Sequence, residues 1–522
     1  MTTAQPLPTA SEVVRETASQ RPNHPAFIQG DEILTYAELD VWMDRVACAL
    51  QRDGVQPKEV IGISAVNSIR YVIAYLGAVR AGICVAPLPT STTPESISKM
   101  MADAGVRSVF VDESGSALIA SAGMPSVPVI GFQNGLPGAV YFDDWLGSSR
   151  NPPEPVAPEP DWPFNIIYSS GTTGTPKGIV QPFGMRAIHL MGGSATLSGY
   201  GANSITLLST PLYSNTTLVS LFPTLGNGGT VLLMDKFDVR KYLELAERYK
   251  VTHTMLVPVQ YQRLMSFPEF GKFDLSSFQT KQCTSAPFSA ELKADILARW
   301  PGKLIESYGM TEGGGVCILE AHSHPDKLHT VGKPAPGHDI RMIDAEGREV
   351  PRGEAGEIVG FSGAAMLGYH GLPEKTREIE WISPEGKRFL RTGDVGRFDE
   401  DGFVALMDRK KDIIISGGFN IYPSDLEEVL REHPAVADAS VVGVQSARWG
   451  ETPVGYVVLK SGSTASGDEI LQWANGKLGK MQRLAAIILT ESLPRNGIGK
   501  VLKRELRERF ESSAQGARHL QV

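Results

Sequence analysis

The chain has 522 residues, more than a single hydrophobic core usually serves, so we expect a large domain and at least one smaller one. Hydrophobic residues make up 42% of the chain and charged residues 21%, which excludes a wholly disordered protein. The net charge of -8 excludes the basic surface that nucleic-acid binding usually needs, so we expect no nucleic-acid partner.

The cysteines and the N-terminus bear on location. The four cysteines lie far apart without a CxxC pair, which indicates reduced thiols rather than a zinc site or a disulfide framework. Residues 1–8 lack the basic and apolar regions of a signal peptide, and the most apolar stretch, 71–88, is interrupted by Arg80 and by glycines. We therefore expect a cytoplasmic protein without a membrane span, either a monomer or a homodimer.

Helical and strand-like segments alternate near the start of the chain. In residues 34–52, apolar side chains recur at helical spacing after Thr35, which is a plausible N-cap. The short apolar runs 60–66 and 83–88 are typical of buried strands, with a helix at about 70–80 between them. This alternation predicts an α/β fold with a largely parallel sheet.

Two changes in composition mark the organisation of the chain. Residues 151–160 (NPPEPVAPEP) are rich in proline and acidic residues, which predicts a stiff linker before a strand at 164–168. Near residue 408 the sequence changes to DRKKDIIISGGFNIYP, and a compact pattern of strands and helices follows. We therefore predict two domains, 1–410 and 411–522.

Residues 168–178 read YSSGTTGTPKG, a loop rich in hydroxyl groups and flexible backbone N–H donors, as polyphosphate oxygens need. Lys177 adds a mobile positive charge. An ordinary turn is the alternative, but eleven consecutive residues fit one pattern. It is not a Walker loop, because Pro176 precedes Lys177 and no serine or threonine follows it. The predicted phosphate-binding residues are Ser169, Ser170, Gly171, Thr172, Thr173, Gly174 and Lys177.

This loop resembles the phosphate loop of the adenylate-forming superfamily, which comprises acyl-CoA synthetases, peptide-synthetase adenylation domains and beetle luciferases. The resemblance covers nearly the full chain, because the other motifs of that family appear in order with similar spacing. It implies an acid–thiol ligase that activates a carboxylic acid with ATP, through an acyl-adenylate, and passes the acyl group to coenzyme A. The implied cofactors are ATP, Mg²⁺ and coenzyme A. The implied fold is α/β, with a large N-terminal domain of layered, mostly parallel sheets and helices and a small, mobile α+β C-terminal domain.

Residues 307–314 read SYGMTEGG. By the resemblance, Tyr308 stacks on adenine, whereas Thr311 and Glu312 contact phosphate and Mg²⁺. The chemistry agrees, because the hard Mg²⁺ ion prefers carboxylate and phosphate oxygens. A helix start capped by Thr311 is the structural alternative.

Other segments match nucleotide-binding positions of the family. Residues 284–288 (TSAPF) match the adenine loop in part, because Thr284 and Ser285 replace the usual glycines. Asp394 in RTGD and Arg409 in DRKKD match the residues that hold the ribose. The residues assigned to the nucleotide in this way are Ser285, Ala286, Pro287, Asp394 and Arg409.

Lys500 ends the segment LPRNGIGK and matches the family lysine that supports adenylate formation. A carboxylate must approach an anionic triphosphate, and a flexible lysine on a glycine-flanked loop can offset the repulsion. The alternative, a solvated surface lysine, fits Lys503 better. We therefore predict Thr311, Glu312 and Lys500 as catalytic residues.

The thiol step needs a different face of the small domain. By the resemblance, this domain rotates about Lys411 and presents Gly417 and Gly418, whose missing side chains let a pantetheine arm pass. Trp449 and Arg483 match positions that contact the nucleotide end of coenzyme A in some aryl-CoA ligases. A glycine hairpin turn is the alternative for the two glycines.

The acyl pocket is the least specific part of the resemblance. Ser214 stands where many relatives have a histidine, and the successive glycines 313–315 suggest room for a ring or a chain. We expect an aromatic, phenylpropenoid or alicyclic acid, with a medium- or long-chain fatty acid as the alternative. Each pocket position could equally be a core residue. The predicted pocket residues are Met191, Ser214, Thr216, Leu256, Tyr261, Thr284, Gly313 and Gly314.

Three other functions stay open. A stand-alone adenylation enzyme would load a carrier protein instead of coenzyme A, and Trp449 and Arg483 favour coenzyme A slightly. A luciferase-type oxygenase would need oxidation of the adenylate, for which the sequence gives no sign. A non-catalytic ATP sensor is disfavoured, because the phosphate, metal and ribose residues occur together with Lys500.

Overall fold

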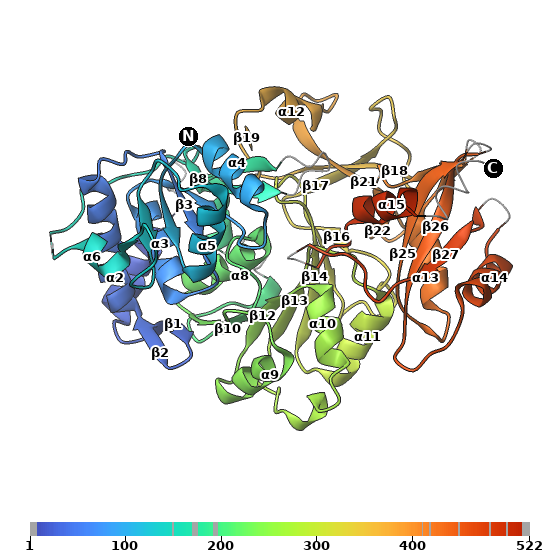
Figure 1. Cartoon of the computed structure of the whole chain (residues 1–522), viewed down its shortest axis with the longest axis horizontal. Helices are drawn as coiled ribbons and strands as arrows, with labels where there is room; N and C mark the ends of the chain where they lie inside the picture. The colour runs from blue at the N-terminus through green and yellow to red at the C-terminus, as the bar shows by residue number, and fades with distance from the viewer. Residues whose placement is uncertain are drawn as a thin grey trace. The chain divides into compact units, whose positions relative to one another are not determined.

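The computed structural model describes residues 8–148, 151–169, 176–191, 197–409, 411–416, 419–446, 449–479, 482–496 and 499–513 (Figure 1). By backbone contacts the chain divides into two compact units: unit 1 is Met1–Ile340 with Gly360–Leu390, and unit 2 is Arg341–Val359 with Arg391–Val522. This division does not coincide with the predicted one at Lys411, because residues 341–359 and 391–409 pack with the C-terminal part of the chain. The hinge at Lys411 stays a prediction.

Unit 1 contains an eight-stranded sheet. Its strands, in spatial order, are β19 (Gly368–Tyr369), β9 (Lys177–Pro182), β8 (Pro163–Ser169), β4 (Cys84–Pro87), β3 (Val60–Ser64), β5 (Val106–Val111), β6 (Val129–Gly131) and β7 (Val140–Tyr141). The pairs β19–β9 and β9–β8 are antiparallel, and every other neighbouring pair is parallel. The edge strands are therefore β19 and β7.

A nine-stranded sheet forms the second layer of unit 1. Its order is β16 (Lys333–Pro334), β15 (Cys317–Glu320), β14 (Lys303–Tyr308), β13 (Thr280–Cys283), β12 (His253–Leu256), β10 (Ile205–Leu208), β11 (Thr230–Leu233), β1 (Pro25–Gln29) and β2 (Glu32–Thr35). The six strands from β14 to β1 in this order run parallel. Their carboxyl ends therefore share one edge of the sheet.

The helices of unit 1 cover and separate these sheets (Figure 1). They are α1 (Ala10–Gln20), α2 (Tyr36–Arg52), α3 (Ile69–Arg80), α4 (Pro94–Ala104), α5 (Glu113–Ala122), α6 (Phe142–Leu146), α7 (Phe183–Leu190), α8 (Asn215–Gly226), α9 (Val239–Arg248), α10 (Pro258–Met265), α11 (Ala290–Arg299) and α12 (Pro373–Glu378), with a short 3-10 turn, η2 (Phe270–Lys272).

The main core of unit 1 lies where α3, α7 and α8 meet β8. Phe164 of β8 makes edge-to-face contacts with Phe183 of α7 and Phe222 of α8, with ring centroids 4.9 and 5.5 Å apart. Almost every residue of α3 is buried, which explains why 71–88 is so apolar. This stretch is a buried helix followed by strand β4, as predicted. Among the described residues, no helix is long and apolar enough to cross a membrane.

Local signals place several elements correctly. Thr35 and Glu38 form a reciprocal capping box at the start of α2, with Oγ1 of Thr35 accepting from the backbone N–H of Glu38 at 3.3 Å. The predicted helices and strands from 34 to 88 are confirmed within one or two residues. The described residues of the segment 151–160 form neither helix nor strand, as its prolines predict. The predicted α/β class is confirmed.

The rest of the chain forms two five-stranded sheets. One has the order β17 (Asp339–Ile343), β18 (Gly356–Phe361), β21 (Arg388–Phe398) and β20 (Glu380–Ile382), with β22 (Val404–Arg409) paired to β21. The other has the order β24 (Phe419–Ile421), β23 (Ile414–Ser416), β26 (Gly450–Leu459) and β25 (Val436–Ser446), with β27 (Ala486–Leu489) paired to β26.

Helices cover both faces of the last sheet in unit 2. They are α13 (Pro423–Arg431), α14 (Gly467–Lys477) and α15 (Lys503–Glu511). Val441 of β25 packs in a core with residues of α13 and α14, whereas its neighbour Val442 packs with Leu506 and Phe510 of α15. Alternate residues of a strand face opposite sides, so both faces of this sheet are apolar and covered.

Candidate nucleotide and acid site

The predicted adenine loop and the SYGMTEGG motif lie side by side at the edge of the nine-stranded sheet. The first follows β13, and the second begins in the last two residues of β14; the two strands are parallel neighbours with Cys283 opposite Glu306. Directly after β13, Oγ1 of Thr284 donates to the carbonyl oxygen of Ser307 in β14 at 2.7 Å. Open α/β sheets bind ligands outside the carboxyl ends of their parallel strands, so both motifs are placed where a nucleotide would bind.

The phosphate motif spans the turn between β8 and β9. Lys177 begins β9, and its Nζ atom lies 5.1 Å from the ring centroid of Tyr369. The described residues leave out the middle of the motif and the side chain of Ser169, so the predicted phosphate contacts there stay predictions. These positions are Ser169, Ser170, Gly171, Thr172, Thr173 and Gly174.

The predicted metal carboxylate, Glu312, is hydrogen-bonded to the edge of the neighbouring eight-stranded sheet. The hydroxyl of Tyr369 donates to Oε1 of Glu312 at 2.7 Å, and the backbone N–H of Met366 donates to the Glu312 carbonyl at 2.8 Å. From β9, Nε2 of Gln181 donates to the carbonyl oxygen of Thr311 at 2.6 Å. Tyr369 and Gln181 were not predicted from the sequence, where neither stands in a motif quoted for the nucleotide.

A buried polar network holds Gln181 in place. The guanidinium of Arg186 donates to Oδ1 of Asn165 and to Oδ1 of Asn215, both at 2.9 Å, and it also bonds Oε1 of Gln181. Burial lowers the pKa of Arg186 to about 10. Burial and the neighbouring Arg186 lower the pKa of His189 to about 3, so its imidazole is neutral and accepts from Arg186 at 3.1 Å.

Ser285 in the TSAPF segment has an unusual backbone. Its φ of 82° lies in the left-handed region, which glycine occupies readily and other residues rarely do. The Oγ atom of Ser285 lies 2.5 Å from Oγ1 of Thr216 in α8, a hydrogen bond that helps to hold this conformation. Such strain is typical of functional sites. Ala286 and Pro287 follow directly in the same loop.

The other predicted pocket residues differ in setting. Ser214 caps α8, with Oγ accepting from the backbone N–H of Thr216 at 3.3 Å. Leu256 is buried, and the buried Tyr261 donates through its hydroxyl to the Gln282 carbonyl at 2.9 Å. Met191 is exposed. Their contact with an acid stays a prediction.

The glycines after Glu312 are required by close chain packing. Gly313 and Gly314 have φ of 82° and 83°. A Cβ atom on Gly313 would lie 2.1 Å from the carbonyl oxygen of Ala364, and one on Gly315 would lie 2.1 Å from Cδ1 of Ile340. The missing side chains at 313 and 315 therefore open no space by themselves, because neighbouring chain lies there, and contact of Gly313 and Gly314 with an acid stays a prediction.

Unit 2 contains the predicted ribose residues and Lys500, whereas the other two predicted catalytic residues, Thr311 and Glu312, belong to unit 1. Asp394 and Arg409 are opposite each other on β21 and β22, with Oδ1 and Nε 3.1 Å apart. Burial, together with the charges of Arg409 and Lys411, lowers the pKa of Lys500 to about 8, although the charges of Asp394 and Asp412 oppose the shift. Burial also lowers the pKa of Lys411. Residues predicted from three separate motifs therefore share one electrostatic environment.

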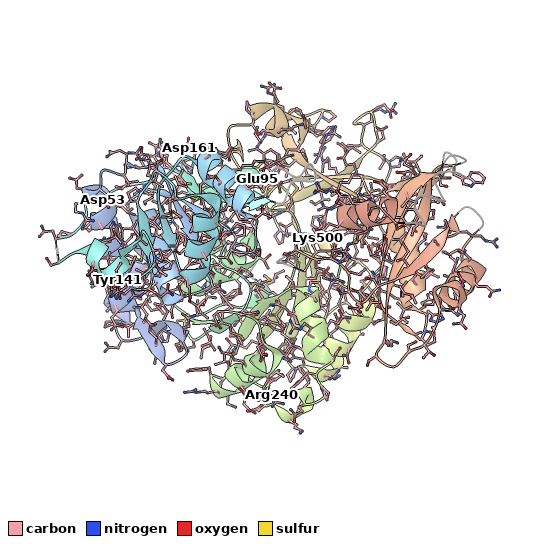
Figure 2. All side chains as sticks on the ribbon, in the orientation of Figure 1. Asp53, Glu95, Tyr141, Asp161, Arg240 and Lys500 are labelled. Atoms are coloured by element: carbon pink, nitrogen blue, oxygen red, sulfur yellow. The ribbon has the colours of Figure 1, made fainter. Side chains whose placement is uncertain are left out.

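The loop that carries Lys500 is braced by side chains. Figure 2 labels Lys500 on the segment that precedes α15. Arg495 donates to the Gly499 carbonyl and to Oδ2 of Asp438, both at 2.6 Å. The backbone N–H of Lys500 donates to Oδ1 of Asn496 at 2.9 Å. This role of Arg495 was not predicted from the sequence.

Lys503 is not the solvated lysine that the sequence suggested. Its side chain is 18% exposed, and Nζ lies 2.9 Å from Oε1 of Glu427 in α13. On the same helix, Arg507 donates to Oδ1 of Asp412 at 2.7 Å. The prediction is wrong because Lys503 and Arg507, one turn apart on α15, pair with α13 and with the segment after β22 instead of facing solvent.

The structure describes two of the four residues that are predicted to bind coenzyme A. Trp449, 42% exposed, lies on the turn between β25 and β26, and Arg483 is exposed just before β27. Gly417 and Gly418 lie outside the described residues. The contacts of all four with coenzyme A stay predictions.

Comparison with known protein families and proteins shows what the chain is similar to. The family described as AMP-binding enzyme matches residues 14–370, and the AMP-binding enzyme C-terminal domain matches residues 425–500. The chain is 32% identical to a feruloyl-CoA synthase of an Amycolatopsis species, over 94% of this chain and 97% of the relative. It is 31% identical to 4-coumarate–CoA ligase 2 of Solanum tuberosum, over 95% and 92%. It is also 31% identical to the fatty acid–[acyl-carrier-protein] ligase ScoC of Streptomyces coeruleorubidus, over 94% and 95%.

Solved structures show the same architecture. ATP-bound MatB from Rhodopseudomonas palustris matches with a TM-score of 0.85 and 29% identity, over 97% of this chain and 99% of that one. The o-succinylbenzoate CoA synthetase MenE from Bacillus subtilis, in complex with its acyl-adenylate intermediate, matches with a TM-score of 0.81 and 27% identity, over 95% and 97%. The chain therefore belongs to the AMP-binding enzyme family, the adenylate-forming superfamily that its motifs predict.

Proposed function

We propose that the protein is an ATP-dependent acid:CoA ligase that works through an acyl-adenylate and releases AMP and pyrophosphate. The observation that carries the proposal is the gathering of Lys500 with the Asp394–Arg409 pair, in a chain that belongs to the AMP-binding enzyme family. A cation beside ribose-binding residues is what the joining of a carboxylate to an anionic nucleotide requires.

In the first step, a carboxylate oxygen of the acid attacks the α-phosphorus of ATP. The bond from this phosphorus to the bridging oxygen breaks, pyrophosphate leaves, and a mixed anhydride of acid and AMP remains. Lys177 offsets charge on the outgoing phosphates, and Lys500 offsets the repulsion between carboxylate and phosphate. Asp394 accepts hydrogen bonds from the ribose hydroxyls, and Arg409 orients its carboxylate. Tyr308 supports the adenine.

The residues around Glu312 fit a magnesium ion. Oε1 of Glu312 accepts from Tyr369, and among the residues that the structure describes none bonds Oε2, so a carboxylate oxygen remains for a cation. The Thr311 hydroxyl and phosphate oxygens would complete the hard-oxygen surroundings that Mg²⁺ prefers. When bound, the ion supplies shielding of the triphosphate charge.

In the second step, the thiolate sulfur of coenzyme A attacks the acyl carbon. The carbon–oxygen bond to AMP breaks, so a thioester forms and AMP leaves. The part of the chain after Lys411 rotates about this residue between the steps, withdraws Lys500 and presents Gly417 and Gly418 to the pantetheine arm. Trp449 and Arg483 are exposed side chains suited to the nucleotide end of coenzyme A.

The acid is an aromatic or phenylpropenoid acid. Support comes from the similarity to a feruloyl-CoA synthase and to 4-coumarate–CoA ligases. Hydroxyl groups near the predicted pocket agree: Tyr200 donates to Oε1 of Gln282 at 2.6 Å and lies 2.7 Å from Oγ of Ser220 in α8. Such groups suit an acid that carries polar substituents on an apolar frame.

A pyrophosphate-release screen tests this proposal. Purified protein with ATP and Mg²⁺ is given aromatic, phenylpropenoid, alicyclic and fatty acids, each with and without coenzyme A, and products are identified by mass spectrometry. We expect thioester and AMP in equal amounts for at least one aromatic acid. Failure of every acid in a broad panel to yield AMP from ATP would contradict the proposal.

A second candidate is a fatty-acid ligase that loads a carrier protein. The similarity to the fatty acid–[acyl-carrier-protein] ligase of Streptomyces coeruleorubidus, at 31% identity, favours this reading. The two functions separate when the same acid is offered with coenzyme A in one reaction and with a pantetheine-bearing carrier protein in another. Thioester on the carrier alone would select the second candidate.

A further inference from the structure

Tyr369 lies between two groups that the proposed chemistry uses. Its hydroxyl donates to Oε1 of Glu312 at 2.7 Å, and the Nζ atom of Lys177 lies 5.1 Å from the centroid of its ring. One side chain therefore contacts the predicted metal carboxylate and the phosphate-motif lysine, although the three residues stand far apart in the sequence.

The backbone holds Tyr369 in this place. Strand β19 pairs antiparallel with β9, which sets Tyr369 opposite Ile179. On one side, the N–H of His370 donates to the Gly178 carbonyl at 2.7 Å. The N–H of Tyr369 donates to Oγ1 of Thr376 at 2.9 Å, and the whole residue is only 9% exposed. Strand pairing therefore fixes the backbone of Tyr369, and its burial leaves the ring little room to turn away from Glu312.

The hydrogen bond also has a fixed direction. The phenol carries the hydrogen of this pair, so it donates and the ionised carboxylate of Glu312 accepts. A phenol on Oε1 restricts rotation of the carboxylate. Lys177 above the ring face is attracted to the electrons of the ring. The phosphate-motif cation and the carboxylate are thus held by one rigid aromatic group.

We propose that Tyr369 is a positioning residue, which orients the carboxylate of Glu312 toward the Mg²⁺ ion of bound ATP. It also keeps Lys177 at a fixed position relative to that carboxylate. This inference rests on the proposed function, since Mg²⁺–ATP is the substrate of that reaction. Groups that orient a metal-binding carboxylate commonly change metal affinity or activity about 10–100-fold when they are removed.

The direct test is Tyr369→Phe, which keeps the ring and removes the hydroxyl. Binding of ATP is measured by titration calorimetry over a range of Mg²⁺ concentrations and again in EDTA. We expect the half-saturating Mg²⁺ concentration for ATP binding to rise about tenfold or more, while ATP affinity in EDTA stays within about twofold of the wild type. Acid-dependent ATP–pyrophosphate exchange should show the same shift in its Mg²⁺ requirement.

A matched control stands on the opposite edge of the same sheet. Tyr141 of β7, labelled in Figure 2, donates to Oδ2 of Asp143 at 2.6 Å, and the guanidinium of Arg70 lies 5.3 Å from its ring centroid. Tyr141→Phe therefore deletes the same kind of hydroxyl–carboxylate bond beside a cation, away from the predicted site. We expect its Mg²⁺ requirement to equal that of the wild type.

Two results would overturn the inference. One is an unchanged Mg²⁺ requirement in Tyr369→Phe. The other is an equal loss of ATP affinity with Mg²⁺ and in EDTA, which would mean a general structural role. In a Glu312→Gln background, Tyr369→Phe should add no further shift, because the group that it aims is gone. These binding readouts need no acid, so they separate failure of this inference from failure of the proposed ligase activity.

Discussion

The charge of Lys500 depends on pH within the range where enzymes are commonly assayed. Burial, aided by Arg409 and Lys411, lowers its pKa to about 8, so the ammonium is present below pH 8 and is lost as the pH rises above it. Adenylate formation needs the charged form in the proposed mechanism. The first half-reaction should therefore slow in mildly alkaline solution.

We predict that kcat/KM for ATP in acid-dependent ATP–pyrophosphate exchange falls above pH 8, since this quantity reports groups of the free enzyme. In Lys500→Arg the remaining activity should not fall there, because a guanidinium stays charged. Lys500→Ala should lower the exchange rate about 100- to 1000-fold. It should spare thioester formation from supplied acyl-adenylate; equal loss of both half-reactions would contradict the assignment.

A second prediction at this scale concerns Ser285. At its φ of 82°, a side chain costs roughly 1–2 kcal/mol relative to glycine. Ser285→Ala and Ser285→Gly both remove the hydrogen bond to Thr216, but only the glycine variant relieves the strain. Ser285→Gly should therefore be the more stable of the two in urea unfolding, contrary to the usual order at ordinary backbone positions. An alanine variant of equal or greater stability would show that the backbone here is unstrained.

The sequence could predict residues within motifs but not the groups that hold them. Asp394, Arg409 and Lys500 were named from three separate motifs, and unit 2 places them together. Tyr369 contacts Glu312 across 57 positions of sequence, and such pairing depends on strand order that no local pattern records. Their roles toward nucleotide, metal and acid stay predictions until they are measured.

At the scale of elements, local chemistry decided what was predictable. Thr35 and Glu38 stand three positions apart, so a short local pattern predicts the start of α2. The first turn of α15 is different. Lys503 lies beside charged neighbours, which is typical of a solvated helix face. It nevertheless pairs with Glu427, which lies far earlier in the chain. Only the folded structure, which brings the start of α15 to Glu427, reveals this.

We predict that Lys503→Met lowers the free energy of unfolding of unit 2 by roughly 2–3 kcal/mol. Breaking a fully buried pair costs about 3–5 kcal/mol, and the partial exposure of Lys503 reduces that figure. The adjacent Arg504 is the control, because it pairs with Glu508 on the surface, and Arg504→Met should cost under about 0.5 kcal/mol. Hydrogen exchange of the amides of α15 and urea unfolding measure both; equal effects would refute a structural role for Lys503.

At the scale of the whole molecule, contacts and function divide the chain differently. Residues 391–409 pack with unit 2, whereas the family resemblance puts the pivot at Lys411, inside that unit. The two divisions differ for a physical reason. A compact unit is defined by the packing of its residues, whereas a pivot needs only a backbone that can change its dihedral angles. The change of composition near 408 predicted a domain boundary, and the resemblance put the pivot there, but neither records which residues pack together.

The hinge is tested by comparing Lys411→Pro with Lys411→Ala. Proline fixes φ and removes the backbone donor, whereas alanine removes only the side chain. Lys411→Pro should slow thioester formation from acyl-adenylate at least tenfold more than it slows ATP–pyrophosphate exchange, and Lys411→Ala should leave the ratio of the two rates near that of the wild type. An unchanged ratio in the proline variant would refute the pivot.

The central claim is that the carboxylate of the acid bonds directly to the α-phosphorus of ATP. An acid labelled with ¹⁸O in its carboxylate tests this most directly, with all phosphate products analysed by mass spectrometry after thioester formation. The account predicts one ¹⁸O atom in AMP for each thioester formed and unlabelled pyrophosphate. Label in inorganic phosphate together with ADP, or thioester formed without any label in AMP, would contradict it.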